Sequence, residues 1–251
     1  MSTPYFRFKQ FSVWHDRCAM KVGTDGVLIG AWASALASEV DSLAESPIVP
    51  TAVGHILDIV TGSGLVALML AQRFPNAFVE GIDIDSSAVE QAQDNFSASP
   101  FSMRMHAYSS PLQEWQPKEK YDMIVSNPPY FSNSLLCPDD MRTKARHNES
   151  LSFANILEHS NRLLKQKGTL SLVLPVDAEK AIMAEARLQH FYCVRLCRVH
   201  TTASKPAKRI LIAFARQEPV SMIVPETLCL SEKGQPRSEA YSALTRDFYL
   251  F

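Results

Sequence analysis

Apolar runs of two kinds alternate along this chain and divide most of it into strands and helices. Short runs rich in Val, Ile and Leu indicate buried strands, and longer apolar runs of helical character follow most of them. Strands are predicted at residues 55–60, 77–82, 103–107, 121–126, 168–175, 192–200 and 208–215. Helices are predicted at residues 26–37, 64–74, 86–97, 151–166 and 177–190.

This alternation predicts an α/β sheet with helices on both faces. The link between the last two strands, residues 203–207, is too short for a helical crossover, so these strands should form an antiparallel hairpin. Residues 6–14 alternate like an added strand that either covers the sheet edge or helps to hold substrate, and covering is the default expectation. Residues 37–54 contain two prolines and should form a surface loop, so a single domain over residues 1–251 is predicted.

A glycine-rich turn follows the first strand of the predicted sheet. Residues 61–64, Thr-Gly-Ser-Gly, separate this strand from a helix, which is the layout of a nucleotide site at the edge of a parallel sheet. Gly62 and Gly64 let the backbone approach a ligand, and the helix N-terminus offers free N–H groups. Asp83 ends the next strand, where its carboxylate can accept hydrogen bonds from both hydroxyls of a ribose.

Two cofactors compete for this turn. Residues 62–67 fit the G-x-G-x-x-A dinucleotide fingerprint, and Asp83 lies at about the expected offset of 20 residues. S-adenosylmethionine has an ammonium group and a ribose but no pyrophosphate. Asp58 can help to hold an ammonium, directly or through water, whereas it would repel phosphates. We therefore favour S-adenosylmethionine.

The sequence Ser-Asn-Pro-Pro-Tyr at residues 126–130 follows another apolar strand. It suits methylation of an exocyclic amine, because the Asn127 side-chain oxygen and a backbone carbonyl can both accept hydrogen bonds from an NH₂ group. Pro128 and Pro129 remove backbone donors and stiffen the turn, and the ring of Tyr130 can stack on a flat substrate. The alternative is a structural turn, since Asn-Pro and Pro-Pro often end secondary structure.

Composition limits the partners and the compartment. With 25 basic and 26 acidic residues the net charge is −1, so any nucleic-acid contact must come from local patches. No apolar run is long enough to span a bilayer, and no signal segment opens the chain. The five scattered cysteines predict reduced thiols in the cytoplasm, and the histidines form no cluster of metal ligands.

Several stretches together resemble one known family over nearly the whole chain. They are residues 11–33, 57–64, 126–130, 145–147, 205–209 and 239–250. These residues resemble the bacterial tRNA(Val) adenine-N6 methyltransferases, which methylate the adenine next to the anticodon. The resemblance implies a class I methyltransferase fold, a Rossmann-like seven-stranded sheet with an antiparallel last strand. The chain departs from the usual acid-x-Gly-x-Gly-x-Gly motif at Val60, and residues 37–54 look long for the family.

The resemblance also implies roles for individual residues, with residues 1–54 as a cap and lid on a core of residues 55–251. The implied catalytic residues are Asn127, Pro128, Pro129 and Tyr130. The implied contacts of S-adenosylmethionine are Lys21, Thr24, Asp25, Asp58, Thr61, Gly62, Gly64, Asp83 and Ile84. Asp25 or Thr24 has a second, compatible interpretation as the N-cap of the helix at residues 26–37.

The implied partner is the anticodon loop of tRNA(Val), bound by a monomer without a metal or a membrane. The candidate RNA contacts are Arg142, Lys144, Arg146, His147, Lys205, Lys208 and Arg209. An ordinary solvated charged loop is the alternative for each cluster. The rival functions are rRNA guanine-N2, protein glutamine or DNA adenine methylation, and a non-catalytic RNA-binding module of the same fold.

Overall fold

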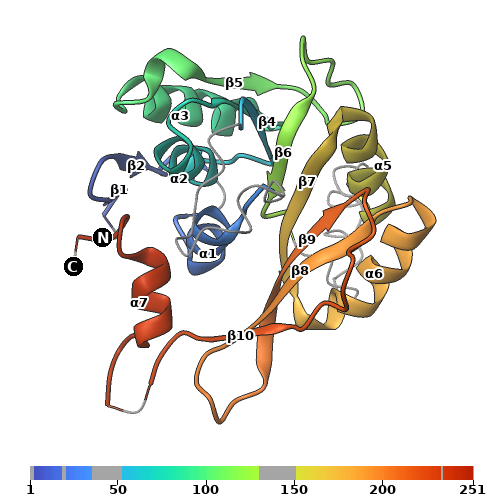
Figure 1. Ribbon diagram of the computed structural model, residues 1–251. Coiled ribbons are helices and arrows are strands. Elements are labelled where there is room, and N and C mark those ends of the chain that lie inside the picture. The colour runs from blue at the N-terminus through green and yellow to red at the C-terminus, as the bar shows by residue number, and fades with distance from the viewer. Residues whose placement is uncertain (1–2, 19–20, 36–52, 130–150, 233, 251) are drawn as a thin grey trace, which may run out of the picture.

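A central eight-stranded sheet organises the protein, with the strand order β10-β8-β9-β7-β6-β3-β4-β5 (Figure 1). The computed structural model describes residues 3–18, 21–35, 53–129, 151–232 and 234–250. The strands are β3 (His55–Ile59), β4 (Phe78–Asp83), β5 (Met105–Ser109), β6 (Tyr121–Ser126), β7 (Leu164–Pro175), β8 (Tyr192–His200), β9 (Ala207–Ala215) and β10 (Glu226–Cys229).

Strand directions confirm the predicted class I methyltransferase topology. Strands β5, β4, β3, β6 and β7 pair in parallel, whereas β9 runs antiparallel to both β7 and β8. The predicted hairpin of the last two strands is therefore present. The eighth strand, β10, pairs in parallel with the edge strand β8 and was not predicted. It has only four residues, two of them exposed, so it carries no apolar run that would reveal it.

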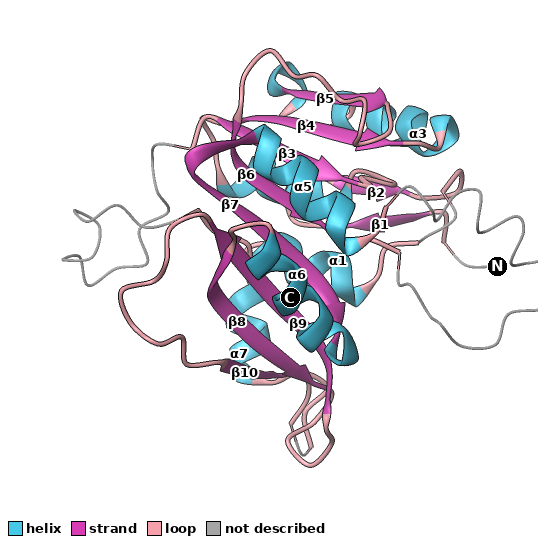
Figure 2. Ribbon diagram, turned by 90° about the vertical axis from the view of Figure 1, so that its right-hand side faces the viewer, coloured by secondary structure: helices cyan, strands magenta, loops and turns pink. Residues whose placement is uncertain are grey.

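Helices cover both faces of the sheet, as predicted. On one face lie α1 (Thr24–Trp32), α2 (Leu65–Arg73) and α3 (Ser86–Ser97), and on the other lie α5 (Phe153–Leu163) and α6 (Glu179–Leu188) (Figures 1 and 2). Each face has its own hydrophobic cluster, because alternate residues of a strand point to opposite sides. In β9, Leu211 and Ala213 join the first cluster while Ile210 and Ile212 join the second.

The first helix differs from its prediction at its beginning. Helix α1 begins at Thr24, two residues earlier than the predicted start at 26, and Gly23 is its N-cap without a side-chain hydrogen bond. The prediction that Asp25 or Thr24 caps this helix is therefore wrong. Asp25 instead lies in the first turn, where its carboxylate accepts a hydrogen bond from Arg209 Nε at 2.9 Å.

The amino-terminal segment forms a small sheet of its own. Strands β1 (Tyr5–Arg7) and β2 (Ser12–Trp14) pair antiparallel in a hairpin that does not join the central sheet, so the prediction that this segment covers the sheet edge is wrong. The hairpin packs near α7 (Glu239–Thr245), and the backbone N–H of Lys9 donates to the carbonyl of Phe248 at 2.8 Å. In the parts of the chain described here, no helix is both long and apolar enough to cross a bilayer.

Candidate active site

A hollow of about 400 Å³ opens at the carboxyl edge of the parallel strands. Its walls come from three segments far apart in the sequence, residues 21–26, residues 60–66 and residues 127–129, with Arg209 added from β9. The second and third segments meet because β3 and β6 are neighbours and end together, with Ile59 opposite Ser126. Such an edge is where open parallel sheets bind their ligands.

Two carboxylates hold the glycine-rich turn in place. Asp58 Oδ2 accepts hydrogen bonds from Thr61 Oγ1 at 2.8 Å and from the backbone N–H of Ala67 at 3.2 Å. Asp83 Oδ2 accepts from the N–H of Gly62 at 2.9 Å, and its Oδ1 accepts from the N–H of Asp85 at 3.1 Å. Both acids therefore fix the backbone that lines the hollow, although neither side chain is part of the lining itself.

Burial changes the acidity of both carboxyl groups. Asp58 is 1% exposed, and this burial raises its pKa to about 7, against the hydrogen bonds from Thr61 and Ala67 that favour the ionised form. Its Oδ1 is buried and has no hydrogen-bond partner among the described residues. Burial also raises the pKa of Asp83, while the backbone N–H groups of Asp85 and Gly62 oppose the rise.

Asp58→Asn is expected to flatten the pH dependence of stability in the absence of ligand. In the unfolded chain Asp58 ionises near its ordinary value of about 4, whereas in the folded protein it keeps its proton until about pH 7. Its contribution to stability is therefore complete below about pH 4 and is lost as the pH rises through about 7. Asparagine keeps the oxygen that Thr61 and Ala67 use but cannot ionise.

Urea unfolding of both proteins at several pH values between about 5 and 8 measures this effect. The free energy of unfolding of the wild type, minus that of the variant, should fall with rising pH. A constant difference would contradict the assignment of a raised pKa to Asp58.

Gly62 and Gly64 both adopt left-handed backbone conformations, with φ of 54° and 78°. At Gly62 a Cβ would meet no atom within 4 Å, so this glycine leaves open space beside the turn. At Gly64 a Cβ would lie 2.4 Å from Cε1 of Phe96, so this glycine lets the turn pack tightly on α3. Gly62 is therefore required because the backbone is left-handed there. Gly64 is required for the same reason and also because Phe96 leaves no room for a side chain.

Val60 stands where the usual motif has glycine, and its φ of 61° lies in the left-handed region. This conformation is strained for a β-branched residue, by roughly 1–2 kcal/mol. Its side chain also lines the hollow. The chain thus tolerates a strained residue at the site itself, held there by the hydrogen bonds that fix the neighbouring Thr61 and Gly62.

Val60→Gly is expected to leave stability equal to wild type or to raise it by up to about 1 kcal/mol, since relief of strain exceeds the extra entropy of an unfolded glycine. Val60→Ala is the matched control, because it removes the branch but keeps the left-handed penalty. Thermal unfolding of the three proteins should rank glycine above alanine. A Val60→Gly protein that is less stable than Val60→Ala would contradict the strain.

The segment of residues 21–26 forms one wall of the hollow. Lys21 and Thr24, both predicted as cofactor contacts, are part of this wall, and Asp25 joins it to β9 through the ion pair with Arg209. Gly26 lies against Leu65 of α2, where an added Cβ would be 3.0 Å from Cδ2 of that leucine. The wall is thus seated on the helix that follows the glycine-rich turn.

The predicted site residues are only partly brought together. Those that line the hollow are Lys21, Thr24, Asp25, Thr61, Gly62, Asn127, Pro128, Pro129 and Arg209. Ile84 follows Asp83 and is 51% exposed. Arg209 was predicted to form one RNA-binding cluster with Lys205 and Lys208. These two lysines are exposed at and just before the beginning of β9, whereas Arg209 forms an ion pair with Asp25. Tyr130, Arg142, Lys144, Arg146 and His147 lie outside the described residues.

Asn95 is a site residue that the sequence reasoning missed. Its Nδ2 donates to the carbonyls of both Trp14 and Ser63, each at 2.8 Å, and its Oδ1 accepts from the N–H of Trp14 at 2.9 Å. One buried amide therefore joins the amino-terminal hairpin to the glycine-rich turn. A signal in the sequence was that Gln91 and Asn95 lie on the buried face of α3, where apolar residues are the rule.

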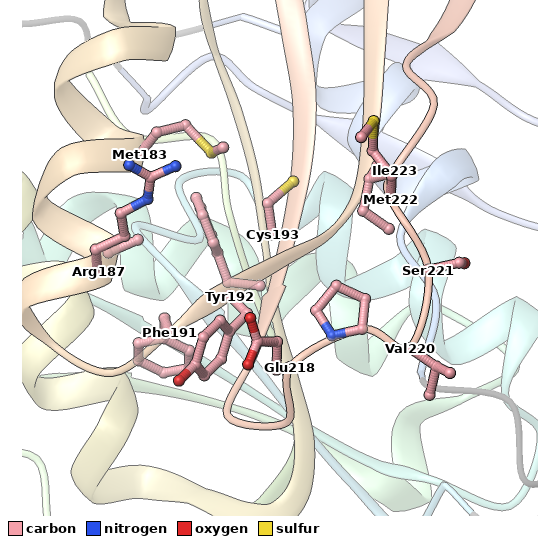
Figure 3. Close-up of a pocket in the computed structure, with 13 residues that line it drawn as sticks. Met183, Arg187, Phe191, Tyr192, Cys193, Glu218, Val220, Ser221, Met222 and Ile223 are labelled. Carbon is pink, nitrogen blue, oxygen red and sulfur yellow. The ribbon is translucent and has the colours of Figure 1, made fainter.

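A second hollow, of about 610 Å³, lies at the opposite edge of the sheet (Figure 3). Its walls come from α6, the beginning of β8 and residues 218–223, and they are largely apolar. Tyr192, one of its lining residues, pairs with Ala215, the last residue of β9, so this edge holds the amino ends of the parallel strands. None of the predicted site residues lines it.

Comparisons with known proteins identify the family. The Methyltransferase small domain family matches residues 40–195. A protein of Parabacteroides distasonis named tRNA1(Val) (adenine(37)-N6)-methyltransferase is 44% identical over 252 residues, covering 100% of this chain and 99% of that protein. A protein of the same name from Klebsiella pneumoniae subsp. pneumoniae is 39% identical, covering 98% of this chain and 95% of that protein.

A solved structure supports the fold alone. It is a predicted O-methyltransferase from Agrobacterium tumefaciens, with a TM-score of 0.64 and 16% identity, covering 88% of this chain and 95% of that chain. The sequence relatives are far closer and extend over the whole chain. The chain therefore belongs to the Methyltransferase small domain family, in the group of proteins named tRNA1(Val) (adenine(37)-N6)-methyltransferase.

Proposed function

We propose that this protein transfers a methyl group from S-adenosylmethionine to N6 of the adenine at position 37 of tRNA1(Val), as the names of its relatives describe. The observation that carries the proposal is the meeting of Asn127, Pro128 and Pro129 with the glycine-rich turn around a single hollow. An amine-binding motif and a nucleotide-type turn at one edge suit methyl transfer, and they have no evident joint role in hydride transfer.

The residues around the turn fit S-adenosylmethionine better than a dinucleotide. A dinucleotide's pyrophosphate would need free N–H groups in the turn, but the N–H of Gly62 is already donated to Asp83. A second carboxylate, Asp58, lies beneath the same turn with one buried oxygen that has no described partner. Two acids beside the site suit a ligand with an ammonium and ribose hydroxyls, because a nearby cation lowers the pKa of Asp58 and favours its ionised form, whereas phosphates would raise that pKa further.

Individual residues would then share the binding of the donor. The turn at Thr61 and Gly62 would line its methionine end, and Lys21, Thr24 and Asp25 would cover it from the other wall. Asp83 accepts hydrogen bonds from the backbone N–H groups of Gly62, Asp85 and Ile84, and a carboxylate has about four lone-pair positions. It therefore retains acceptor capacity for ribose hydroxyls.

The bound donor would supply an electrophilic methyl group on a sulfonium. The Asn127 side-chain oxygen and the carbonyl of Pro128 would accept the two hydrogens of the adenine amine, which biases the nitrogen toward a tetrahedral form and aims its lone pair. No strong base is needed, because the amine proton becomes acidic only after the methyl group has been transferred. Positioning of this kind lowers barriers by up to about 7–11 kcal/mol in ideal cases.

The surface beside the hollow has a basic feature suited to RNA. Lys205 is exposed in the turn before β9 and Lys208 at the beginning of β9, and Arg209 pairs with Pro175 at the carboxyl end of β7. These lysines therefore lie at the same edge of the sheet as the hollow. Phosphates of a bound tRNA arm would pass over them while its unpaired target base entered the pocket.

Lys205→Ala combined with Lys208→Ala is expected to weaken binding of tRNA and to reduce its dependence on salt. Removing one lysine–phosphate interaction lowers the slope of log K against log[salt] by about 0.7–0.9. Lys118→Ala with Lys120→Ala is the matched control, since these exposed lysines precede β6 at the opposite edge. Equal salt slopes in the two double variants would assign Lys205 and Lys208 to an ordinary solvated surface.

The proposed function is tested by incubating the protein with labelled S-adenosylmethionine and unmodified tRNA1(Val) transcript, followed by mass spectrometry of the nucleosides. N6-methyladenosine next to the anticodon is the expected product. Binding of the donor without transfer to this tRNA would overturn the substrate and leave rRNA, protein glutamine or non-catalytic RNA binding to be tested with the same label.

A further inference from the structure

The hairpin of β1 and β2 has two different faces. Its inner face carries Phe6 and Val13, which are opposite each other in the register, and Val13 is fully buried. Its outer face carries Tyr5 and Trp14, a second cross-strand pair, which are 39% and 44% exposed. The two outer rings lie with centroids 4.9 Å apart at 39°. An aromatic pair is thus presented to solvent on a separate, well-seated sheet.

Trp14 also forms one wall of a hollow of about 320 Å³. The other lining residues are Asp16, Arg17, Gln91, Asp94 and Ala98. This lining mixes carboxylate acceptors with a guanidinium donor, and Arg17 forms an ion pair with Asp94. A flat ring beside a mixed set of donors and acceptors matches the π-face and the polar edge of a nucleobase, whereas a lipid or an aliphatic chain would leave the polar groups without partners.

The outer aromatic pair lies next to the proposed site of methyl transfer. Asn95 donates to the carbonyls of Trp14 and Ser63, so the hairpin and the wall of the main hollow are separated by a single side chain. Ser63 itself lines that hollow. Figure 2 shows the hairpin on the side of the sheet toward which the β3 arrow points.

Two arginines on or beside this face can contact RNA. Arg7 follows Tyr5 by two residues in β1, so it lies on the same outer face, and it is exposed. Guanidinium groups bind phosphates and stack on bases, and successive bases of unpaired RNA stack on exposed aromatic rings. The carboxylates of the smaller hollow are partly neutralised by Arg17, which pairs with Asp94 and lies 3.9 Å from Glu90.

We propose that Tyr5 and Trp14 form a stacking platform for an unpaired nucleotide that flanks the methylated adenine. The platform rests on the proposed function, because it names a contact of the same RNA substrate. A base stacked there would hold the RNA strand while the neighbouring adenine is turned into the main hollow. Stacking is indifferent to base identity, so the platform would contribute affinity rather than sequence specificity.

The test compares Trp14→Phe with Trp14→Leu, because both keep an apolar side chain in the hairpin but only phenylalanine keeps a π-face. Binding of a fluorescent RNA hairpin with the tRNA1(Val) anticodon arm is measured by anisotropy. Trp14→Leu is expected to raise the dissociation constant about 5- to 150-fold, and Trp14→Phe by much less. Phe78→Leu is the matched control, since Phe78 is 53% exposed at the beginning of β4, on the opposite edge.

A second measurement separates stacking from support of the glycine-rich turn. The dissociation constant of S-adenosylmethionine should be the same in both Trp14 variants and the wild type. A weaker S-adenosylmethionine complex in Trp14→Leu would overturn the platform, because the effect would then pass through Asn95. Equal RNA affinity of the two Trp14 variants would also overturn it. The proposed function is refuted separately, if the wild type binds this RNA but does not methylate tRNA1(Val). Even then, a loss of RNA binding in Trp14→Leu and not in Trp14→Phe would support the platform.

Discussion

Asn127→Ala is expected to lower the rate of methyl transfer by at least about 10²–10³-fold, the loss typical when one preorganised group at a reacting centre is removed. Asn127 begins the segment that follows β6 and lines the main hollow with Pro128 and Pro129. Alanine removes the acceptor for one amine hydrogen, so the nitrogen of the target adenine would remain planar and poorly aimed. Single-turnover methylation of tRNA1(Val) transcript measures the chemical step directly.

Two control measurements distinguish a loss of the chemical step from a loss of donor binding. Binding of S-adenosylmethionine, measured by calorimetry, should stay within about threefold of wild type, because the contacts proposed for the donor lie on other segments. Asn127→Asp keeps an acceptor oxygen and should retain more activity than Asn127→Ala. An alanine variant with near-normal single-turnover rates would refute the role of Asn127 in holding the amine.

Gly64→Ala is expected to destabilise the protein by roughly 2–5 kcal/mol, combining the penalty of a left-handed alanine with overpacking of a buried contact. Gly64 has a φ of 78° at the N-cap of α2, and its added Cβ would lie 2.4 Å from Phe96 Cε1. Phe96 is fully buried in the first hydrophobic cluster, so it has little room to move. Urea unfolding, followed by circular dichroism, measures the loss.

Gly62→Ala is the matched control for this prediction. Its φ of 54° also lies in the left-handed region, but an added Cβ would meet nothing within 4 Å. This variant should therefore cost only about 1–2 kcal/mol. Equal losses in the two alanine variants would mean that contact with Phe96 does not limit the turn. The two variants also distinguish an effect on stability from an effect on donor binding. Only the Cβ at Gly62 would enter the open space beside the proposed donor site.

The central sheet could be predicted from the sequence because its strands are buried on both faces. Runs such as Ile56–Ile59 and Met123–Val125 are buried along their whole length, a pattern that parallel strands between two helical layers produce. The turn at Gly62 and Gly64 could be located by composition, since few other residues adopt such conformations. The segments that line the candidate site could therefore be located because their local sequence allows few backbone conformations.

The missed features depend on contacts between distant parts of the chain. The pair of Asp25 and Arg209 joins residues 184 positions apart, so no local pattern reveals it, and an exposed basic cluster was a reasonable interpretation of Lys205–Arg209. The separate hairpin of β1 and β2 depends on packing against α3, where Asn95 accepts from the N–H of Trp14 and Gln91 accepts from the N–H of Arg17, just after the hairpin. Polar residues on a buried helix face were the one local sign of this docking.

The contact of the hairpin with the carboxyl-terminal segment sets an order on the maturation of the enzyme. The ring of Phe8 stacks on Tyr249 with centroids 5.9 Å apart, and the backbone of Lys9 bonds to Phe248. The ribosome synthesises Phe248 and Tyr249 some 240 residues after the hairpin. The hairpin therefore cannot complete its packing until the carboxyl-terminal segment has been made. Chains that are released early keep the glycine-rich turn and Asn127 but lack the ring of Tyr249 against Phe8. Premature termination would thus yield proteins that keep the residues of the proposed donor site and yet expose aromatic side chains, and such exposed surface promotes aggregation.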